Sequence, residues 1–363
     1  MKDFLGYKDK VCVVTGAASG IGKATAEFLI DLGAKVYALD INEIELNGVK
    51  NFIQVDLCSK DAIDMAFEEI PKQIDCFFGI AGQSGIKTNY YSTFTVNYIA
   101  NKYITENYLK KRMDRGGSIS YVTSLGAKHW DKYYSEFRDF TVAKTWNDMI
   151  KALHEKANEN TLGIMAYPLS KRALNYYMVE QAIELARRGI RVNALMPGST
   201  DTNSINDYAV MAGSMENLVT DAGLIGRLAN PQEIAEPLVF LNSDMARFIS
   251  GYPMVVDYGY DSLVNLGIKK DKSNVKVGSK LYNLDFMQKM LSKKYNITPV
   301  VTSHSEPNIP VMNQPAINTI MEGSNTTEMQ VIHDDFMDQL EEEKNENTTP
   351  EIVEEVLEEE EIL

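Results

Sequence analysis

The chain has 363 residues, a net charge of −15 at pH 7 and three cysteines. An odd and sparse set of cysteines is no disulfide framework, and no cysteine–histidine cluster suggests a metal site, so we expect Cys12, Cys58 and Cys76 to be reduced core residues of a cytoplasmic protein. No stretch approaches the about 18 apolar residues that a membrane span needs, and the start shows no apolar region of a signal peptide.

The negative charge is concentrated near the C-terminal end. Residues 326–363 contain 15 acidic residues and one lysine, a net of −14, which leaves −1 for residues 1–325. The body of the chain therefore has no global charge bias toward nucleic acid or an anionic membrane surface, and we expect neither as a partner.

Residues 10–263 alternate short apolar runs with helix-like stretches. Such alternation predicts right-handed crossovers and a Rossmann-like, doubly wound α/β sheet with seven parallel strands. The expected strands are residues 11–15, 35–40, 51–56, 75–81, 118–124, 191–196 and 254–258. The expected helices are residues 21–32, 60–70, 93–113, 167–188 and 231–243.

A helical insertion, residues 127–165, precedes the helix that is expected to begin at Tyr167. Apolar residues at helical spacing predict a helix within residues 142–157. We expect Trp130 and Trp146 to pack in a local core rather than against a substrate. The insertion is predicted to shield the Tyr167 helix and to change the surface that is available for dimerisation.

The character of the chain changes beyond residue 263, which predicts a catalytic domain over residues 1–263. Residues 264–300 form a lysine-rich extension. Residues 301–363 form an acidic tail that we expect to be largely disordered, with one or two helices that form on a partner. Three interpretations of the tail stay open: it binds an unknown basic partner, it folds back on the lysine-rich segment 269–294, or it is a solubilising extension.

The segment Thr15-Gly-Ala-Ala-Ser-Gly-Ile-Gly22 places a glycine turn between the first strand and the first helix. Such a turn lets the backbone approach a pyrophosphate closely, and the helix N-terminus supplies free N–H groups and partial positive charge. Gly16, Gly20 and Gly22 are therefore predicted to hold a dinucleotide. The alternative is an ordinary strand–helix loop.

Two acids follow the next strands. Asp40 closes the second strand, where a carboxylate can accept both ribose hydroxyls and repel a 2′-phosphate. Ser19, not a basic residue, precedes Gly20, so we predict NAD(H) rather than NADP(H). Asp56 closes the third strand and can accept from an adenine amino group. The alternatives are a helix cap or turn acid at Asp40 and an Asx turn at Asp56.

Tyr167 and Lys171 are four residues apart, so a helix places both side chains on one face. A nearby ammonium and the positive ring of an oxidised nicotinamide would lower the pKa of the phenol, which can then exchange a proton with a carbonyl or an alcohol. Pro168 suits a first helical turn. Ser124 can orient the substrate oxygen or cap its strand. Asn97 can hold a water that connects to Lys171, or it is a polar surface residue.

In this order, these motifs resemble the short-chain dehydrogenase/reductase family over residues 8–263. Further matches are Val55-Asp-Leu57, Ile80-Ala-Gly82, Val192-Asn-Ala-Leu-Met-Pro-Gly198 with Thr202, and Gly226-Arg-Leu-Ala-Asn-Pro-Gln-Glu-Ile-Ala235. The resemblance implies a catalytic tetrad of Asn97, Ser124, Tyr167 and Lys171. It implies that Lys171 binds the nicotinamide ribose and that the stretch after Gly198 binds the carboxamide and covers the substrate. The further cofactor-binding residues are Ser19, Ile21, Leu57, Ala81, Gly82, Pro197, Gly198, Thr200 and Thr202.

The architecture is most similar to the 3α-hydroxysteroid dehydrogenase/carbonyl reductase branch. Only ten residues link Asp40 to the next strand, and a long insertion separates Ser124 from Tyr167. Two motifs depart from the family pattern, namely Gly79-Ile-Ala-Gly82 and Asp257-Tyr-Gly259, and neither change removes a catalytic side chain.

The branch resemblance implies an NAD-dependent enzyme that interconverts a secondary alcohol and a ketone, such as a hydroxysteroid or bile acid. The Met-, Ala- and Gly-rich stretch 208–226 is suited to an apolar lid over a small-molecule substrate that is a bulky hydrophobic alcohol or ketone. We expect a homodimer or homotetramer. The alternatives are a general carbonyl or 3-oxoacyl reductase and a non-catalytic NAD(H)-sensing protein.

Overall fold

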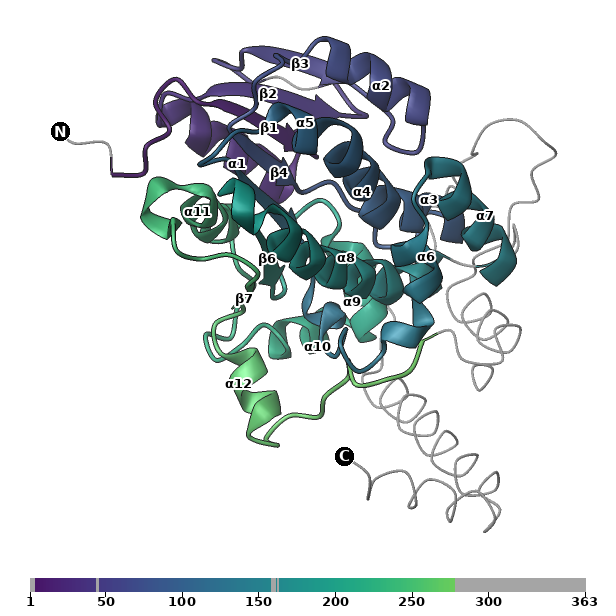
Figure 1. Ribbon diagram of the computed structural model, residues 1–363. Helices are drawn as coiled ribbons and strands as arrows, with labels where there is room; N and C mark the ends of the chain where they lie inside the picture. Colours follow the sequence, from purple (N-terminus) through teal and green to yellow (C-terminus); the bar gives the residue numbers. More distant parts are fainter. Residues whose placement is uncertain (1–3, 44–45, 158–160, 162, 278–363) are drawn as a thin grey trace.

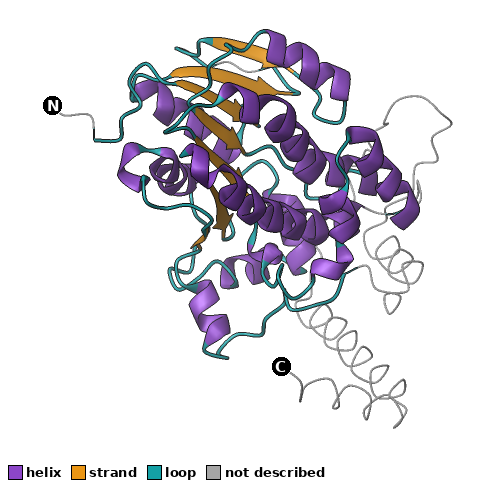
Figure 2. Cartoon of the chain, in the orientation of Figure 1, coloured by secondary structure: helices purple, strands orange, loops and turns teal. Residues whose placement is uncertain are grey.

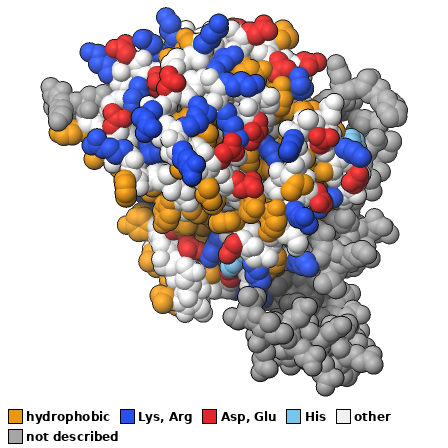
Figure 3. Space-filling model, viewed as in Figure 1, with side chains coloured by type: hydrophobic (Ala, Val, Ile, Leu, Met, Phe, Trp, Pro, Cys, Tyr) orange, Lys and Arg blue, Asp and Glu red, His pale blue; other side chains and the backbone are white. Residues whose placement is uncertain are grey.

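The computed structural model describes residues 4–43, 46–157, 161 and 163–277 (Figure 1). The expectations for residues 278–363, which include the acidic tail and most of the lysine-rich extension, lie outside the described residues. Within the described part of the chain, no helix is both long and apolar enough to cross a membrane. Figure 3 shows basic and acidic side chains interspersed over one face of the molecule.

Seven parallel strands form one sheet in the order β3-β2-β1-β4-β5-β6-β7, which confirms the predicted fold (Figures 1 and 2). The strand order reverses between β1 and β4, so a crevice opens at the carboxyl ends of these two strands. The strands are β1 Val11–Thr15, β2 Lys35–Asp40, β3 Asn51–Gln54, β4 Cys76–Gly79, β5 Ser118–Val122, β6 Arg191–Pro197 and β7 Pro253–Val256.

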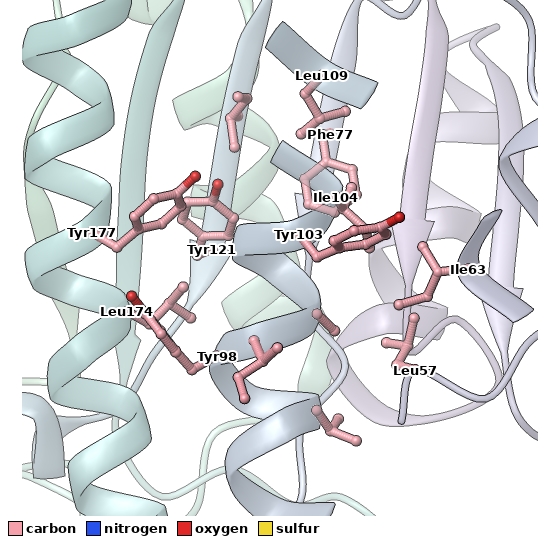
Figure 4. Packing of buried hydrophobic residues seen from close by; sticks show 14 of the residues in the cluster. Leu57, Ile63, Phe77, Tyr98, Tyr103, Ile104, Leu109, Tyr121, Leu174 and Tyr177 are labelled. Atoms are coloured by element: carbon pink, nitrogen blue, oxygen red, sulfur yellow. The ribbon is translucent and has the colours of Figure 1, made fainter. Parts of the chain in front are cut away.

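Helices cover both faces of the sheet, and each face has its own apolar core. On one face Leu29 of α1 and Leu238 of α11 pack against β1 and β2. On the other face Tyr98, Tyr121 and Leu174 belong to a cluster that α2, α4 and α8 cover (Figure 4). The α-helices are α1 Gly20–Asp31, α2 Lys60–Glu68, α3 Tyr90–Phe94, α4 Ala100–Ile104, α5 Lys110–Arg112, α6 Arg138–Val142, α7 Trp146–Lys156, α8 Gly163–Leu185, α9 Ile205–Ala212, α10 Met215–Thr220, α11 Pro231–Asn242 and α12 Tyr260–Asn265.

Several strands end earlier than predicted, because polar side chains begin turns there. β3 ends at Gln54, and Asp56 accepts a hydrogen bond from the Cys58 amide at 2.8 Å in the following loop. β5 ends at Val122, and Ser124 accepts one from the Gly126 amide at 3.1 Å. β4 and β7 likewise end before residues 81 and 258.

Two helix predictions need correction. The helix predicted over residues 93–113 runs from residue 90 to residue 112, and π-helical turns at Thr95–Ile99 and Thr105–Leu109 interrupt it. The helix predicted to begin at Tyr167 begins at Gly163, so Pro168 lies inside α8 and not in its first turn. At Gly163 the backbone approaches the loop after β4 closely, since a Cβ there would lie 2.2 Å from the Thr88 carbonyl oxygen.

The insertion folds into α6 and α7 beside α8 (Figure 1). Trp146 packs edge-on against Tyr103, with ring centroids 5.4 Å apart, and Trp130 packs in the same manner against Tyr176 at 6.2 Å. Both tryptophans thus take part in local aromatic packing, as predicted. The predicted domain boundary at residue 263 falls inside α12, and residues 266–277 return toward the insertion.

Candidate active site

A cavity of about 790 Å³ lies at the carboxyl ends of the strands. It brings together every predicted site residue except Asn97, although these residues come from seven separate stretches of the chain. The predicted residues that line it are Gly16, Ser19, Gly20, Ile21, Gly22, Asp40, Asp56, Leu57, Ala81, Gly82, Ser124, Tyr167, Lys171, Pro197, Gly198, Thr200 and Thr202. No group of three or more metal-ligating side chains occurs among the described residues.

The glycine turn leaves no room for side chains. A Cβ on Gly22 would lie 1.9 Å from the Gly16 carbonyl oxygen, and one on Gly16 would lie 2.8 Å from the Ala81 Cα. Gly16 also has a φ of +73°, which L-residues with a side chain rarely adopt. The turn therefore forms a backbone cradle that leads directly into the N-terminus of α1 at Gly20.

Asp40 acts as a turn acid and also faces the cavity. Its Oδ2 accepts a hydrogen bond from the Ala18 amide at 2.9 Å, and its Oδ1 accepts one from the Asn42 amide at 2.9 Å. The carboxylate thus holds the glycine turn against the end of β2. Both interpretations given for Asp40 from the sequence are compatible with this geometry, and the Asx-turn interpretation of Asp56 is confirmed by its bond to the Cys58 amide.

Tyr167 and Lys171 lie on one face of α8, as their spacing predicted. The Tyr167 side chain is buried, and the Lys171 Nζ lies 5.9 Å from the centre of its ring. Lys171 donates a hydrogen bond to the Val122 carbonyl oxygen at 2.9 Å, which fixes the ammonium beside the end of β5. Ser124 follows two residues later in the same loop and lines the same cavity.

Burial dominates the electrostatics of this group. It raises the pKa of Tyr167, while hydrogen bonds with Ser124 and Tyr208 oppose the increase. It lowers the pKa of Lys171 to about 8. From the sequence, the ammonium and an oxidised cofactor were expected to lower the pKa of Tyr167. In the chain by itself the net pKa shift is upward, because removal of the phenolate from water costs more free energy than the hydrogen bonds with its neighbours recover.

Asn97 is buried at one of the π-helical turns and does not line the cavity, so its interpretation as a surface residue is wrong. Its Oδ1 accepts a hydrogen bond from the Gln83 amide at 2.8 Å, and its Nδ2 donates to the Gln83 carbonyl oxygen at 3.0 Å and to Ser170 Oγ at 3.1 Å. A Cβ on Gly82 would lie 3.3 Å from both Asn97 Oδ1 and Lys171 Nζ. Asn97 therefore ties the loop after β4 to α8, close to the ammonium.

The predicted lid contains two helices, α9 and α10, and brings a residue to the site that the sequence did not single out. Tyr208 lines the cavity, and its hydroxyl lies 3.5 Å from that of Tyr167. The neighbouring Asp207 holds α9 down, because it accepts a hydrogen bond from Ser84 Oγ at 2.7 Å and pairs with Lys87 Nζ at 3.0 Å. A tyrosine in a stretch without regular spacing carried no signal for this role.

The returning segment after α12 also lines the cavity. Residues 270–273, Val275 and Val277 contribute to its wall. From the sequence, these residues were predicted to belong to the lysine-rich extension, without a role in the site. Lysine-rich composition indicates a solvated surface, so no sequence signal pointed to this position.

Comparisons with known proteins cover most of the described chain. Residues 10–135 match the family model described as short chain dehydrogenase, and residues 149–261 match the model described as enoyl-(acyl carrier protein) reductase. The coniferyl-alcohol dehydrogenase of Pseudomonas sp. (strain HR199) is 32% identical over 261 residues, which are 70% of this chain and 97% of that protein. The NAD-dependent glycerol dehydrogenase of Listeria innocua is 31% identical over 274 residues, which are 71% and 96% of the two chains.

Solved structures show the same fold. The crystal structure of the 3-alpha-hydroxysteroid dehydrogenase from Pseudomonas sp. B-0831, complexed with NADH, matches with a TM-score of 0.60 and 22% sequence identity. The match covers 71% of this chain and 99% of that chain. At this identity the likeness establishes the fold alone.

Proposed function

Because this chain belongs to the short-chain dehydrogenase family and is an oxidoreductase that acts on alcohol and ketone groups, we propose that it interconverts a secondary alcohol and a ketone with NAD(H). One observation carries the proposal. The glycine cradle and the Tyr167–Lys171 pair line the same cavity, so a dinucleotide bound at the first can present its nicotinamide ring beside the second.

The residues of the cavity fit a dinucleotide. Gly16 and Gly22 leave backbone where any side chain would collide, which is the shape that a pyrophosphate needs. When bound, NAD(H) supplies or accepts the hydride. The Asp40 carboxylate lines the cavity and would meet a 2′-phosphate with like charge, while Ser19 offers no positive charge to compensate. These two residues support NAD(H) over NADP(H).

The proton chemistry belongs to the side chains of α8 and the loop after β5. The raised pKa keeps the Tyr167 phenol protonated at neutral pH, which is the state that donates to a carbonyl oxygen during reduction. In the oxidation direction Tyr167 must lose this proton, which positive charge beside the phenol favours. Ser124 holds the substrate oxygen, and Asn97 positions the loop that leads to Lys171.

We propose a hydroxysteroid or bile acid as the substrate class. The lid contributes Met211, Ala212 and Leu218 to the cavity, so its substrate side is largely apolar. The short link after Asp40 and the long insertion before α8 are the branch features that support a bulky cyclic alcohol. A general carbonyl or 3-oxoacyl reductase remains the alternative within the family.

The experiment measures nicotinamide absorbance on the purified full-length protein. NAD and NADP are each combined with 3-, 7- and 17-hydroxysteroids and with small polar alcohols. Tyr167→Phe is compared with Tyr176→Phe, which removes a hydroxyl from the same helix outside the cavity. We expect turnover of one steroid position with NAD, a loss of about 10²–10⁴-fold in Tyr167→Phe, and no such loss in the control.

Each other outcome has a defined meaning. Turnover of small polar alcohols without any steroid rejects the substrate class but keeps the enzyme. Preference for NADP rejects the role given to Asp40. Tight NADH binding without turnover of any alcohol favours the NAD(H)-sensing alternative.

Assembly and location are further proposals. We propose a homodimer or homotetramer in the cytoplasm, with an insertion that changes the available dimer surface. Light scattering of the full-length protein tests the first point. A variant that lacks residues 128–157 and keeps the same oligomeric state would contradict the role of the insertion.

A further inference from the structure

The chain runs along the cavity after α12. We call residues 268–277 the strap. Residues 270–273, Val275 and Val277 of the strap line the cavity together with the lid and the predicted catalytic residues. The strap lies beyond residue 261, where the family match ends. It is therefore a wall of the site that the matched family model does not cover.

Side chains of the insertion hold the strap in place. His129 Nε2 lies 2.7 Å from Asp271 Oδ2. Asn274 Oδ1 accepts hydrogen bonds from the Tyr133 hydroxyl at 2.8 Å and from Lys132 Nζ at 3.0 Å. These contacts join positions about 140 residues apart in sequence, so the insertion serves as the platform on which the strap rests.

Arg172 fastens the middle of the strap from the side of α8. Its Nη2 donates to the Ser273 carbonyl oxygen at 2.6 Å and to the Val275 carbonyl oxygen at 2.9 Å. Its Nη1 pairs with Glu136 Oε2 of the insertion at 3.2 Å. The Arg172 side chain is fully buried, and that of Glu136 is 2% exposed. One guanidinium thus connects the catalytic helix, the insertion and the strap.

Two charged residues of the strap take part in its attachment, and Lys270 also lines the cavity. Asp271 contacts His129, and Lys272 pairs with Asp221 of the segment after α10 at 2.9 Å. The strap residues that line the cavity without a charge include Val275 and Val277, and Val277 is only 7% exposed. The face that the strap offers to a substrate therefore contains two branched apolar side chains.

We propose that the strap is the outer wall of the substrate site and that Val275 and Val277 determine specificity, by contact with the end of the alcohol that is remote from the reacting carbon. The wall selects bulky alcohols with an apolar far end over small ones. This inference rests on the proposed function, and it names the substrate class from residues outside the family match.

The test compares kcat/KM for a bulky alcohol with an apolar far end and for a small alcohol in the full-length protein. Val275→Ala removes part of the wall, and Val275→Trp fills the space in front of it. Ile268→Ala is the matched control, because Ile268 lies on the same strap but is 65% exposed and does not line the cavity. NADH affinity is measured in each variant by fluorescence.

We expect Val275→Ala to lower kcat/KM for the bulky alcohol by about tenfold, mainly through KM, with little effect on the small alcohol. Val275→Trp should lower it further. The control and the NADH affinities should stay unchanged. If Val275→Trp does not fold, the kcat/KM values of Val275→Ala alone test the role of Val275 in specificity.

A second pair of variants tests the attachment of the strap. Tyr133→Phe removes the hydroxyl that donates to Asn274, whereas Tyr134→Phe removes a neighbouring hydroxyl that lies 3.4 Å from Thr141 Oγ1, away from the strap. We expect Tyr133→Phe to raise KM for the bulky alcohol by about fivefold, the equivalent of one hydrogen bond, and Tyr134→Phe to leave it unchanged.

The outcomes separate the two proposals. A wild-type protein that turns over no alcohol overturns the proposed function and this inference with it. An active wild type whose Val275 and Tyr133 variants keep the wild-type ratio of bulky to small substrates overturns the inference alone.

Discussion

Replacement of Arg172 by methionine should destabilise the protein much more than replacement of Arg172 and Glu136 together. The single change leaves the Glu136 carboxyl in a site where its side chain is 2% exposed, without the guanidinium at 3.2 Å. The double variant Arg172→Met with Glu136→Gln contains no charge in this place. The comparison therefore isolates the cost of an unpaired buried charge from the loss of the other contacts of Arg172.

The magnitude follows from the burial of the pair. Removal of one partner of a buried ion pair costs about 3–5 kcal/mol of the free energy of unfolding. The double variant loses the hydrogen bonds to the Ser273 and Val275 carbonyl oxygens, about 1 kcal/mol each. We therefore expect about 4 kcal/mol for Arg172→Met and about 2 kcal/mol for the double variant.

The cost of Arg172→Met should also depend on pH. Burial raises the pKa of Glu136 to about 7, against the opposing effect of Arg172. A carboxyl whose pKa is higher in the folded than in the unfolded state contributes stability below its unfolded pKa, and this contribution is lost as the pH rises through the folded pKa. Without Arg172 the folded pKa rises further. The deficit of Arg172→Met should therefore approach that of the double variant at pH 5 and be larger at pH 8.5.

The assay is urea denaturation of the wild type, both single variants and the double variant at the two pH values. Tryptophan fluorescence is a suitable signal, because Trp130 and Trp146 both belong to the insertion that carries Glu136. Costs of the two single variants that add up to the cost of the double variant within about 0.5 kcal/mol would refute the reasoning. So would a deficit of Arg172→Met that does not change with pH.

Three other predictions concern the site itself. Burial lowers the pKa of Lys171 from 10.5 to about 8, so the folded protein should gain about 3 kcal/mol of stability relative to Lys171→Met between pH 8 and pH 10.5, measured by denaturation of the cofactor-free proteins. Tyr208→Phe should move the pH profile of alcohol oxidation to higher pH, because the Tyr208 hydroxyl helps to lower the pKa of Tyr167. An unchanged profile would show that the Tyr208 hydroxyl has no influence on the pKa of Tyr167. Gly22→Ala should abolish NADH binding in a fluorescence titration, since its Cβ would lie 1.9 Å from the Gly16 carbonyl oxygen, and normal affinity would show that the turn can move aside.

The sequence was most informative where one local rule decides the structure. The strands at Val11–Thr15 and Lys35–Asp40 were predicted with correct bounds, because buried parallel strands are continuous apolar runs between clear turn signals. The pair Tyr167 and Lys171 followed from helical spacing alone. The ends of β3 and β5 were missed, because whether Asp56 or Ser124 extends a strand or begins a turn depends on which backbone amide its side chain reaches.

Other parts of the site depend on contacts between distant segments. The sequence alone identifies Asn97 only as a polar residue of a helix. Its burial becomes apparent from its contacts with the loop at Gln83 and with α8 at Ser170. The position of the strap follows from pairs such as His129 with Asp271, for which no periodicity or motif gives a signal. Such contacts are properties of the folded chain, so sequence patterns do not reveal them.

The attachment of the strap to the insertion has a consequence for transplanting parts of this enzyme. The two segments lie far apart in the sequence, yet Tyr133 and Asn274 share a hydrogen bond and a single arginine of α8 contacts both segments.

 The hydrogen-bonded pair itself is separated by 141 positions in the chain. A graft of the insertion alone into a related enzyme would leave its polar anchors facing water, and a graft of the strap alone would leave it without a platform. The two segments therefore form one exchangeable module, and a chimaera that is meant to acquire this substrate site has to receive both, together with the arginine that joins them.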